Sequence, residues 1–203
     1  MMERLEKALK KRFLEEDVKA IAEILSIASE KGSIIYDELE IPDDGKDDLL
    51  LLEKERLLIP ARTSRALAWE DRMMIFKSGE VFEMPNVIGY LIRNVEETGE
   101  WNPDQAVRTY LEEIGEKTPE AIISLFNKVK EDAKYFRITP EVILRASEEL
   151  KLTAEIGRII AELKGGGIIS PCLRDPSRLL YEINPSLVKR EIPDGSLNAS
   201  KRP

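Results

Sequence analysis

Apolar residues recur at helical spacing along most of the chain, so the sequence predicts a largely helical protein. One short amphipathic stripe comes before a triple glycine and consists of Ile156, Ile159, Ile160 and Leu163. The glycines at 165–167 stand where a helix carries its C-terminal cap, because glycine adopts the left-handed conformation without a steric penalty. A phosphate-binding glycine loop would come before a helix and include a Lys-Ser/Thr pair. We therefore interpret the glycines as a helix stop rather than a nucleotide site.

The same spacing predicts further helices, and prolines mark where three of them start. Apolar stripes cover residues 3–13, 16–31, 46–56, 84–99, 103–115, 119–134 and 140–150. Three of these helices begin with a capping side chain followed by proline: Asn102-Pro103, Thr118-Pro119 and Thr139-Pro140. The helix at 84–99 is expected to join the two parts of the chain in place of a flexible linker.

Short extended segments between the helices predict two hairpins. Their arms are 57–59 with 68–76, and 167–170 with 179–183. After the glycine that ends the second helix, Ser33 is expected to cap a short helix with the sequence IIYDELEI. The tail at 191–203 is expected to be disordered.

Composition describes a globular protein large enough for two small domains of about 100 residues each. The chain has 203 residues, of which 42% are hydrophobic and 34% are charged. No apolar run approaches the roughly 18 residues that cross a bilayer, and the segment MMERLEKALKKRF lacks the apolar centre of a secretory signal. We expect a cytoplasmic protein with no membrane contact. A single glutamine beside abundant Glu, Lys and Arg is typical of proteins from hyperthermophiles.

Residue chemistry argues against an enzyme. The chain has no histidine, which removes the usual zinc sites and every histidine-based catalytic dyad. Its one cysteine, Cys172, therefore lacks an activating base. The carboxylate pairs Glu112-Glu113 and Glu148-Glu149 are adjacent on helices and project about 100° apart, so they do not face each other. We predict no catalytic residue, no metal and no cofactor.

Charge is distributed unevenly. The formal net charge is −8, with 15 basic and 23 acidic residues in the first 100 and 16 of each in the remainder. Residues 30–56 are acid-rich, and the following loop carries Arg62, Arg65, Arg72 and Lys77. That loop could contact a phosphate backbone, but mutual neutralisation with the acidic segment is the favoured interpretation. Residues 151–190 have seven basic and four acidic side chains, so they form the better candidate for an anionic partner.

The C-terminal part carries a resemblance to a known family. The stretch ITPEVILRASEELKLTAEIGRIIAELKGGGIISPCLRDPSRLLYEINP resembles archaeal and bacterial winged helix-turn-helix regulators. The resemblance implies a second helix at Pro140–Leu150, a recognition helix at Thr153–Lys164 and a wing at 168–183. We therefore expect a mainly α fold with small antiparallel β-hairpins (α+β), in which two winged-helix domains are joined by a helical middle section. The expected parts are an N-terminal helix at 1–13, domains at 14–80 and 117–190, and a connector at 84–116.

The function implied by the resemblance is DNA binding in transcriptional regulation, mainly through the C-terminal domain and with no enzymatic activity. Thr153 and Arg158 would face the base edges of double-stranded DNA. The phosphates would be held by Lys151, Lys164, Arg174 and Arg178. A homodimer or a protein partner is also expected.

A different class of function stays open. Overall acidity, with Glu155 and Glu162 on the same helix as Arg158, favours a protein-binding scaffold without DNA readout. Tandem winged-helix subunits of chromosome-segregation and general-transcription complexes are similar examples. Positive potential at the second hairpin would favour DNA, and an apolar patch there would favour a protein partner.

Overall fold

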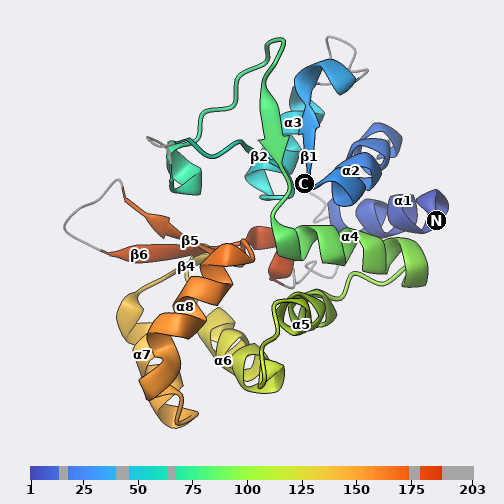
Figure 1. Cartoon of the computed structure of the whole chain (residues 1–203). Coiled ribbons are helices and arrows are strands. Elements are labelled where there is room, and N and C mark those ends of the chain that lie inside the picture. Colours follow the sequence, from blue (N-terminus) through green and yellow to red (C-terminus); the bar gives the residue numbers. More distant parts are fainter. Residues whose placement is uncertain (14–17, 40–45, 64–66, 174–178, 189–203) are drawn as a thin grey trace, which may run out of the picture.

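Helices make up most of the protein in the computed structural model, which describes residues 1–13, 18–39, 46–63, 67–173 and 179–188 (Figure 1). The α-helices are α1 (Met2–Phe13), α2 (Lys19–Lys31), α3 (Lys46–Lys54), α4 (Asn86–Thr98), α5 (Pro103–Glu113), α6 (Pro119–Glu131), α7 (Pro140–Glu149) and α8 (Ile156–Gly165). Single 3₁₀ turns are η1 (Tyr36–Glu38), η2 (Trp69–Asp71), η3 (Thr153–Glu155) and η4 (Pro185–Leu187). The prolines at 103, 119 and 140 each occupy the first helical position, as predicted.

Two small antiparallel sheets have the same strand arrangement. The strands are β1 (Ser33–Ile35), β2 (Ile59–Pro60), β3 (Val81–Glu83), β4 (Arg137–Ile138), β5 (Ile169–Cys172) and β6 (Leu180–Ile183). In the first sheet β3 lies between β1 and β2, and in the second β6 lies between β4 and β5. The expected α+β class, mainly helical with small antiparallel hairpins, is confirmed at this level. We call residues 19–83 the first half and residues 119–188 the second half.

The first hairpin differs from its prediction. Its second arm is β3 at Val81–Glu83, not residues 68–76. Within that range, residues 69–71 form the turn η2, and the Trp69 ring is buried. Burial of a large aromatic ring against the second half explains why this apolar segment leaves the first sheet.

Each sheet also has a third strand that the sequence did not reveal. Strand β1 spans three residues and starts the segment that was expected to be a helix, while β4 spans two. Segments this short show no alternation that could distinguish a strand from a turn.

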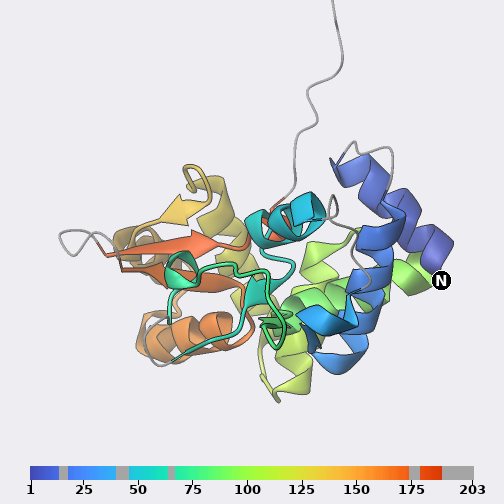
Figure 2. The same ribbon diagram turned by 90° about the horizontal axis from the view of Figure 1, so that it is seen from above.

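One hydrophobic core extends through both halves. The α1 side chains Leu5, Ala8, Leu9 and Phe13 are buried, and α1 packs on α2 and α4 of its own chain. Helices α4 and α5 pack on each other, and α4 also contacts α2 while α5 contacts α6. Figures 1 and 2 show α4 and α5 between the first half and α6–α8. The middle section thus joins the two halves through packed side chains.

The triple glycine ends α8, as its position predicted, and it also packs closely against the middle section. Gly167 has φ +70, and the Ile168 N–H donates to Leu163 O at 2.9 Å, which is a Schellman-type cap. A Cβ on Gly166 would lie 2.5 Å from the Tyr110 ring, and one on Gly167 would lie 2.5 Å from Pro85 Cβ. These glycines are therefore required for close packing of α4 and α5 as well as for the turn.

Candidate nucleic-acid interface and the junction beside it

The residues expected to contact DNA lie along η3 and α8, as far as the structure describes them. Lys151 and Thr153 come before the helix and are exposed, and Lys151 has φ +59. Arg158 is on the outer face of α8, and Lys164 is exposed at its last turn. The remaining two, Arg174 and Arg178, lie outside the described residues.

Arg158 is surrounded by carboxylates. Its guanidinium forms ion pairs with Glu155 and Glu116, and a third with Glu162 at 2.6 Å. Hydrogen bonds to Glu155, Glu116 and Glu162 raise the pKa of Arg158 above its ordinary value. Glu155 and Glu162 lie one turn away on either side, and Glu116 comes from the loop after α5. The cation predicted to read bases is thus neutralised within its own chain.

The Glu116 carboxylate is the most strongly perturbed member of this cluster. Its burial raises its pKa, but this effect is outweighed by hydrogen bonds from the Thr118 N–H, Arg158 and the Thr118 hydroxyl. The result is a pKa of about 2, against 4.5 ordinarily. Glu116 therefore remains charged at neutral pH and keeps Arg158 paired.

The cations that remain beside α8 are far apart. Lys151 and Lys164 are separated by 13 residues, which is roughly 20 Å along a helix. Neither has a carboxylate partner among the described residues. The structure therefore does not bring the predicted DNA-binding residues together into one continuous basic surface over the part of the chain that it describes.

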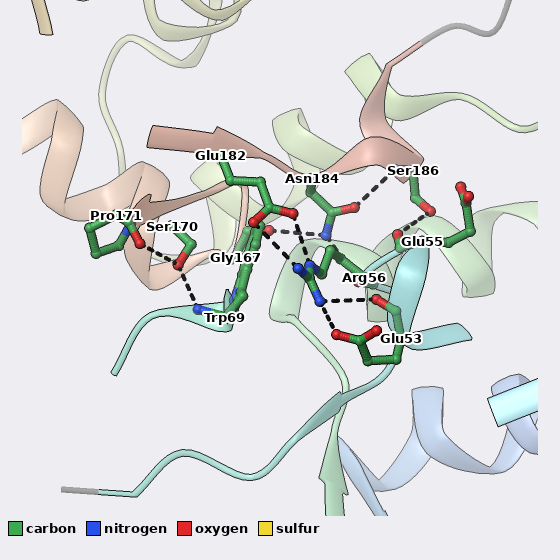
Figure 3. A network of polar contacts seen from close by, with 10 residues as sticks. All are labelled: Glu53, Glu55, Arg56, Trp69, Gly167, Ser170, Pro171, Glu182, Asn184 and Ser186. Carbon is green, nitrogen blue, oxygen red and sulfur yellow. Dashed lines mark hydrogen bonds and ion pairs between the residues drawn. The ribbon is translucent and has the colours of Figure 1, made fainter. Parts of the chain in front are cut away.

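A polar junction connects the first half to the second (Figure 3). Arg56, just beyond α3, pairs with Glu53 and donates from Nε to Glu182 Oε1 at 2.9 Å. The Asn184 amide donates to the backbone oxygens of Arg56, at 3.0 Å, and Gly167, at 3.3 Å. Since Asn184 is fully buried and Arg56 is only 12% exposed, these contacts are largely shielded from water.

The loop between β2 and β3 extends this junction. Its turn η2 packs on β5, where the Trp69 N–H donates to Ser170 Oγ at 3.1 Å and the Leu173 N–H donates to Glu70 Oε1 at 2.6 Å. Figure 3 shows Trp69 beside the residues of the second sheet. The basic loop that could have contacted a phosphate backbone is therefore attached to the second half at Trp69 and Glu70.

The basic side chains of this loop have different environments. Arg72 is 7% exposed and pairs with Glu83, while Lys77 lies 3.9 Å from Glu80. Arg62 is exposed, and Arg65 lies outside the described residues. Arg72 and Lys77 are thus neutralised within the first half, but by Glu83 and Glu80 and not by the acid-rich segment 30–56.

Exposed apolar side chains surround this junction on the outside. Tyr135 precedes β4 and is 95% exposed, and Met73 follows η2 and is 76% exposed. We give the name hairpin surface to these two side chains together with the exposed Leu67, Leu173 and Leu179, which come from the segments next to η2, β5 and β6. A cavity of about 710 Å³ next to it is lined by Trp69, Met74, Tyr135, Cys172 and Leu180, among others. Sequence patterns missed this surface because its members come from loops far apart in the chain.

Cys172 lies in the wall of this cavity and is buried, and burial raises the pKa of its thiol. A thiol with a raised pKa is a poor nucleophile. Within the described ranges, no group of three or more Cys, Asp or Glu residues could hold a metal ion. No described helix is both long enough and apolar enough to span a bilayer.

Comparison with known proteins assigns the chain to a family. A family model, for a family of unknown function, matches residues 3–191, so the chain belongs to that family. No curated protein and no solved structure matches it.

Proposed function

We propose that this member of a family of unknown function is a tandem winged-helix protein that acts as a protein-binding scaffold. The support for two winged-helix modules is topological. Each half runs helix, strand, helical segments and two further strands, and in each sheet the last strand lies between the other two. The helical segments after the first strand are α7, η3 and α8 in the second half, and η1 and α3 in the first half, which also has the turn η2 between its last two strands.

The observation that carries the scaffold function is the hairpin surface. Its five apolar side chains are exposed and come from the segments next to η2, β4, β5 and β6, and of these elements η2 and β5 are in contact. Large apolar side chains that meet beside a cavity are typical of protein interaction sites. Neutralisation of Arg158 by its three carboxylates favours the same conclusion.

The partner that fits this surface is a segment of another protein with apolar side chains flanked by basic ones. Apolar residues would cover Met73 and Tyr135 and enter the adjacent cavity. Basic flanks are favoured because the formal net charge of the chain is −8, which attracts cationic segments over long range.

Site-specific photocrosslinking tests this function. A photoreactive residue at Met73 or Tyr135 is expected to capture the same partner chain, and one at Leu144, an apolar residue on α7 that is 43% exposed, is expected not to capture it. The purified partner should then bind the Met73→Ser/Tyr135→Ser variant at least about tenfold more weakly than the unmodified chain. Leu144→Ser serves as the matched control. Equal capture at Leu144, or undiminished binding by the double variant, would contradict a docking role for the hairpin surface.

DNA binding through the second half is a second candidate, favoured by the exposed and unpaired Lys151 and Lys164 in the described chain. It predicts binding to a short duplex that weakens steeply with added salt, because phosphate contacts release counterions. The variant Arg174→Glu/Arg178→Glu should abolish that binding. The scaffold function instead predicts no duplex binding at low salt, so one titration separates the two candidates.

A further inference from the structure

A second cavity, of about 470 Å³, lies where the two halves meet the start of α4. Its lining includes the end of α2, the β2 and β3 strands, the first residue of α4 and the glycines that end α8. Figure 1 shows the carboxyl end of α8 and the amino end of α4 side by side at the centre of the molecule. The cavity volume is within the range of roughly 300–1,000 Å³ found for small-molecule sites.

The charge of this cavity is positive although the chain is acidic. Four cationic side chains line it, Lys31, Arg62, Arg72 and Lys164, together with one carboxylate, Glu83. Two of the cations, Arg62 and Lys164, have no carboxylate partner among the described residues. They come from opposite halves, so an anion in the cavity would meet cations of both halves.

Arg72 supplies a buried donor on the wall of this cavity. Its guanidinium, only 7% exposed, donates from Nη1 to Glu83 Oε2 at 3.0 Å and to Pro60 O at 3.2 Å. Its Nε is buried and has no hydrogen-bond partner in the described structure. An unsatisfied donor on a charged, buried group is costly, and an acceptor in the cavity would remove that cost.

The backbone around the cavity contributes dipoles of both signs. The amino end of the 13-residue helix α4, at Asn86, lines it, and so do the carboxyl ends of α2 and α8. The Val87 N–H at the start of α4 already donates to Gly166 O at 3.0 Å, so the preference of the cavity for anions rests on its side chains. The Asn86 amide donates to Gly165 O at 3.2 Å, which fixes the helix start against the glycine turn.

We propose that this cavity binds the phosphate group of a small phosphorylated molecule, held by Arg62 and Arg72 from the first half and Lys164 from the second. A phosphate has enough acceptor oxygens for all three cations, and charge-assisted hydrogen bonds of this kind are the stronger ones. Because the ligand contacts both halves, its binding stabilises the junction between them. The cavity shares Trp69 and Arg72 with the cavity beside the hairpin surface, whereas Arg62 and Lys164 line only the phosphate site.

Calorimetric titration of the full chain with inorganic phosphate and with pyrophosphate tests the site, with sodium chloride of equal ionic strength as the blank. We expect saturable binding and a rise in melting temperature with phosphate concentration. The Arg62→Ala/Lys164→Ala variant should bind at least about tenfold more weakly. Lys164→Arg should bind like the unmodified chain, since it keeps the charge.

The matched control is Lys10→Ala/Lys117→Ala, which removes the same charge at exposed positions outside the cavity lining. It is expected to bind within about twofold of the unmodified chain, because distant charges are largely screened. If both double variants bound phosphate equally weakly, the loss of affinity would be due to net charge alone, and the proposal would be overturned. Lack of saturable phosphate binding, or binding of a short DNA duplex without binding of either phosphate probe, would also overturn it.

Discussion

Two arginines, one at the junction and one on the outer face of α8, show how location decides what an ion pair does. Arg56 is 12% exposed and connects Glu53 of the first half to Glu182 of the second. Arg158 is 41% exposed, and its carboxylates come from α8, η3 and the loop after α5. The pairs at Arg56 are shielded from water and fix two parts of the fold, whereas Arg158 and Glu155 are exposed and only Glu116, at 3%, is shielded, so the cluster mainly cancels a surface charge.

Replacement of Arg56 by alanine is expected to have the largest effect. It leaves Glu182, only 14% exposed, without its cation, and we expect the free energy of unfolding to fall by about 3–5 kcal/mol. The corresponding Arg158→Ala variant should lose less, about 1–2 kcal/mol, because Glu116 keeps its hydrogen bonds from the Thr118 N–H and hydroxyl. Urea denaturation of both variants measures the difference, and equal losses would break the comparison between the two sites.

A pair of glycines extends the comparison to the backbone. Gly167 at the junction has φ +70 and lies against Pro85, so Gly167→Ala is expected to lower the free energy of unfolding by about 2–4 kcal/mol. Gly157 on α8 has no atom within 4 Å of the position that a Cβ would occupy, and Gly157→Ala should raise it by about 0.5–1 kcal/mol. Thermal or urea unfolding that gave both changes the same sign would refute the packing described for the glycine turn.

A single hydrogen bond between the halves should have a smaller effect. Ser170→Ala removes the acceptor of the buried Trp69 N–H, for an expected loss of about 1–3 kcal/mol in the free energy of unfolding. Ser124→Ala, at an exposed position on α6, is the control and should change it by less than about 0.5 kcal/mol. Urea denaturation followed by circular dichroism measures both variants, and an unchanged midpoint for Ser170→Ala would show that the contact contributes nothing.

The smallest expected effect is the pH dependence of the outer cluster. Because the pKa of Glu116 is lowered from 4.5 to about 2 in the folded chain, the stability it contributes is complete above 4.5 and is lost as the pH falls toward 2. Glu116→Gln should reduce the slope of stability against pH within that window. The slope near neutral pH should be unchanged. Urea midpoints measured across the window would contradict this assignment if the two proteins lost stability in parallel.

The sequence predicted those parts of the fold that depend on local signals. Prolines after Asn102, Thr118 and Thr139 predicted three helix starts, and the triple glycine predicted the end of α8. Such helix ends depend on residues close together in the chain, so one sequence is sufficient to find them. Of the three expected capping side chains, only Asn102 accepts a hydrogen bond from its helix, and Thr118 and Thr139 do not. Strands β1 and β4 owe their conformation to pairing with distant β3 and β6, which no local pattern reveals.

The candidate site illustrates the same limit. Two of the partners of Arg158 lie within one turn and could be read from the sequence, but Glu116 is 42 residues away. The contact of Trp69 with Ser170 spans 101 residues, so nothing local indicated that the basic loop would attach to the second half. Predictions of surface charge from sequence fail where tertiary contacts pair the charges.

The glycine turn restricts how this chain can vary by recombination. Although both halves have the same strand arrangement, the turn that ends α8 fits against Tyr110 and Pro85 of the middle section. A second half transferred alone into another protein would lose Tyr110 and Pro85, the two residues against which its glycines pack. The repeated halves are therefore expected to be inherited together with the middle section, as one unit.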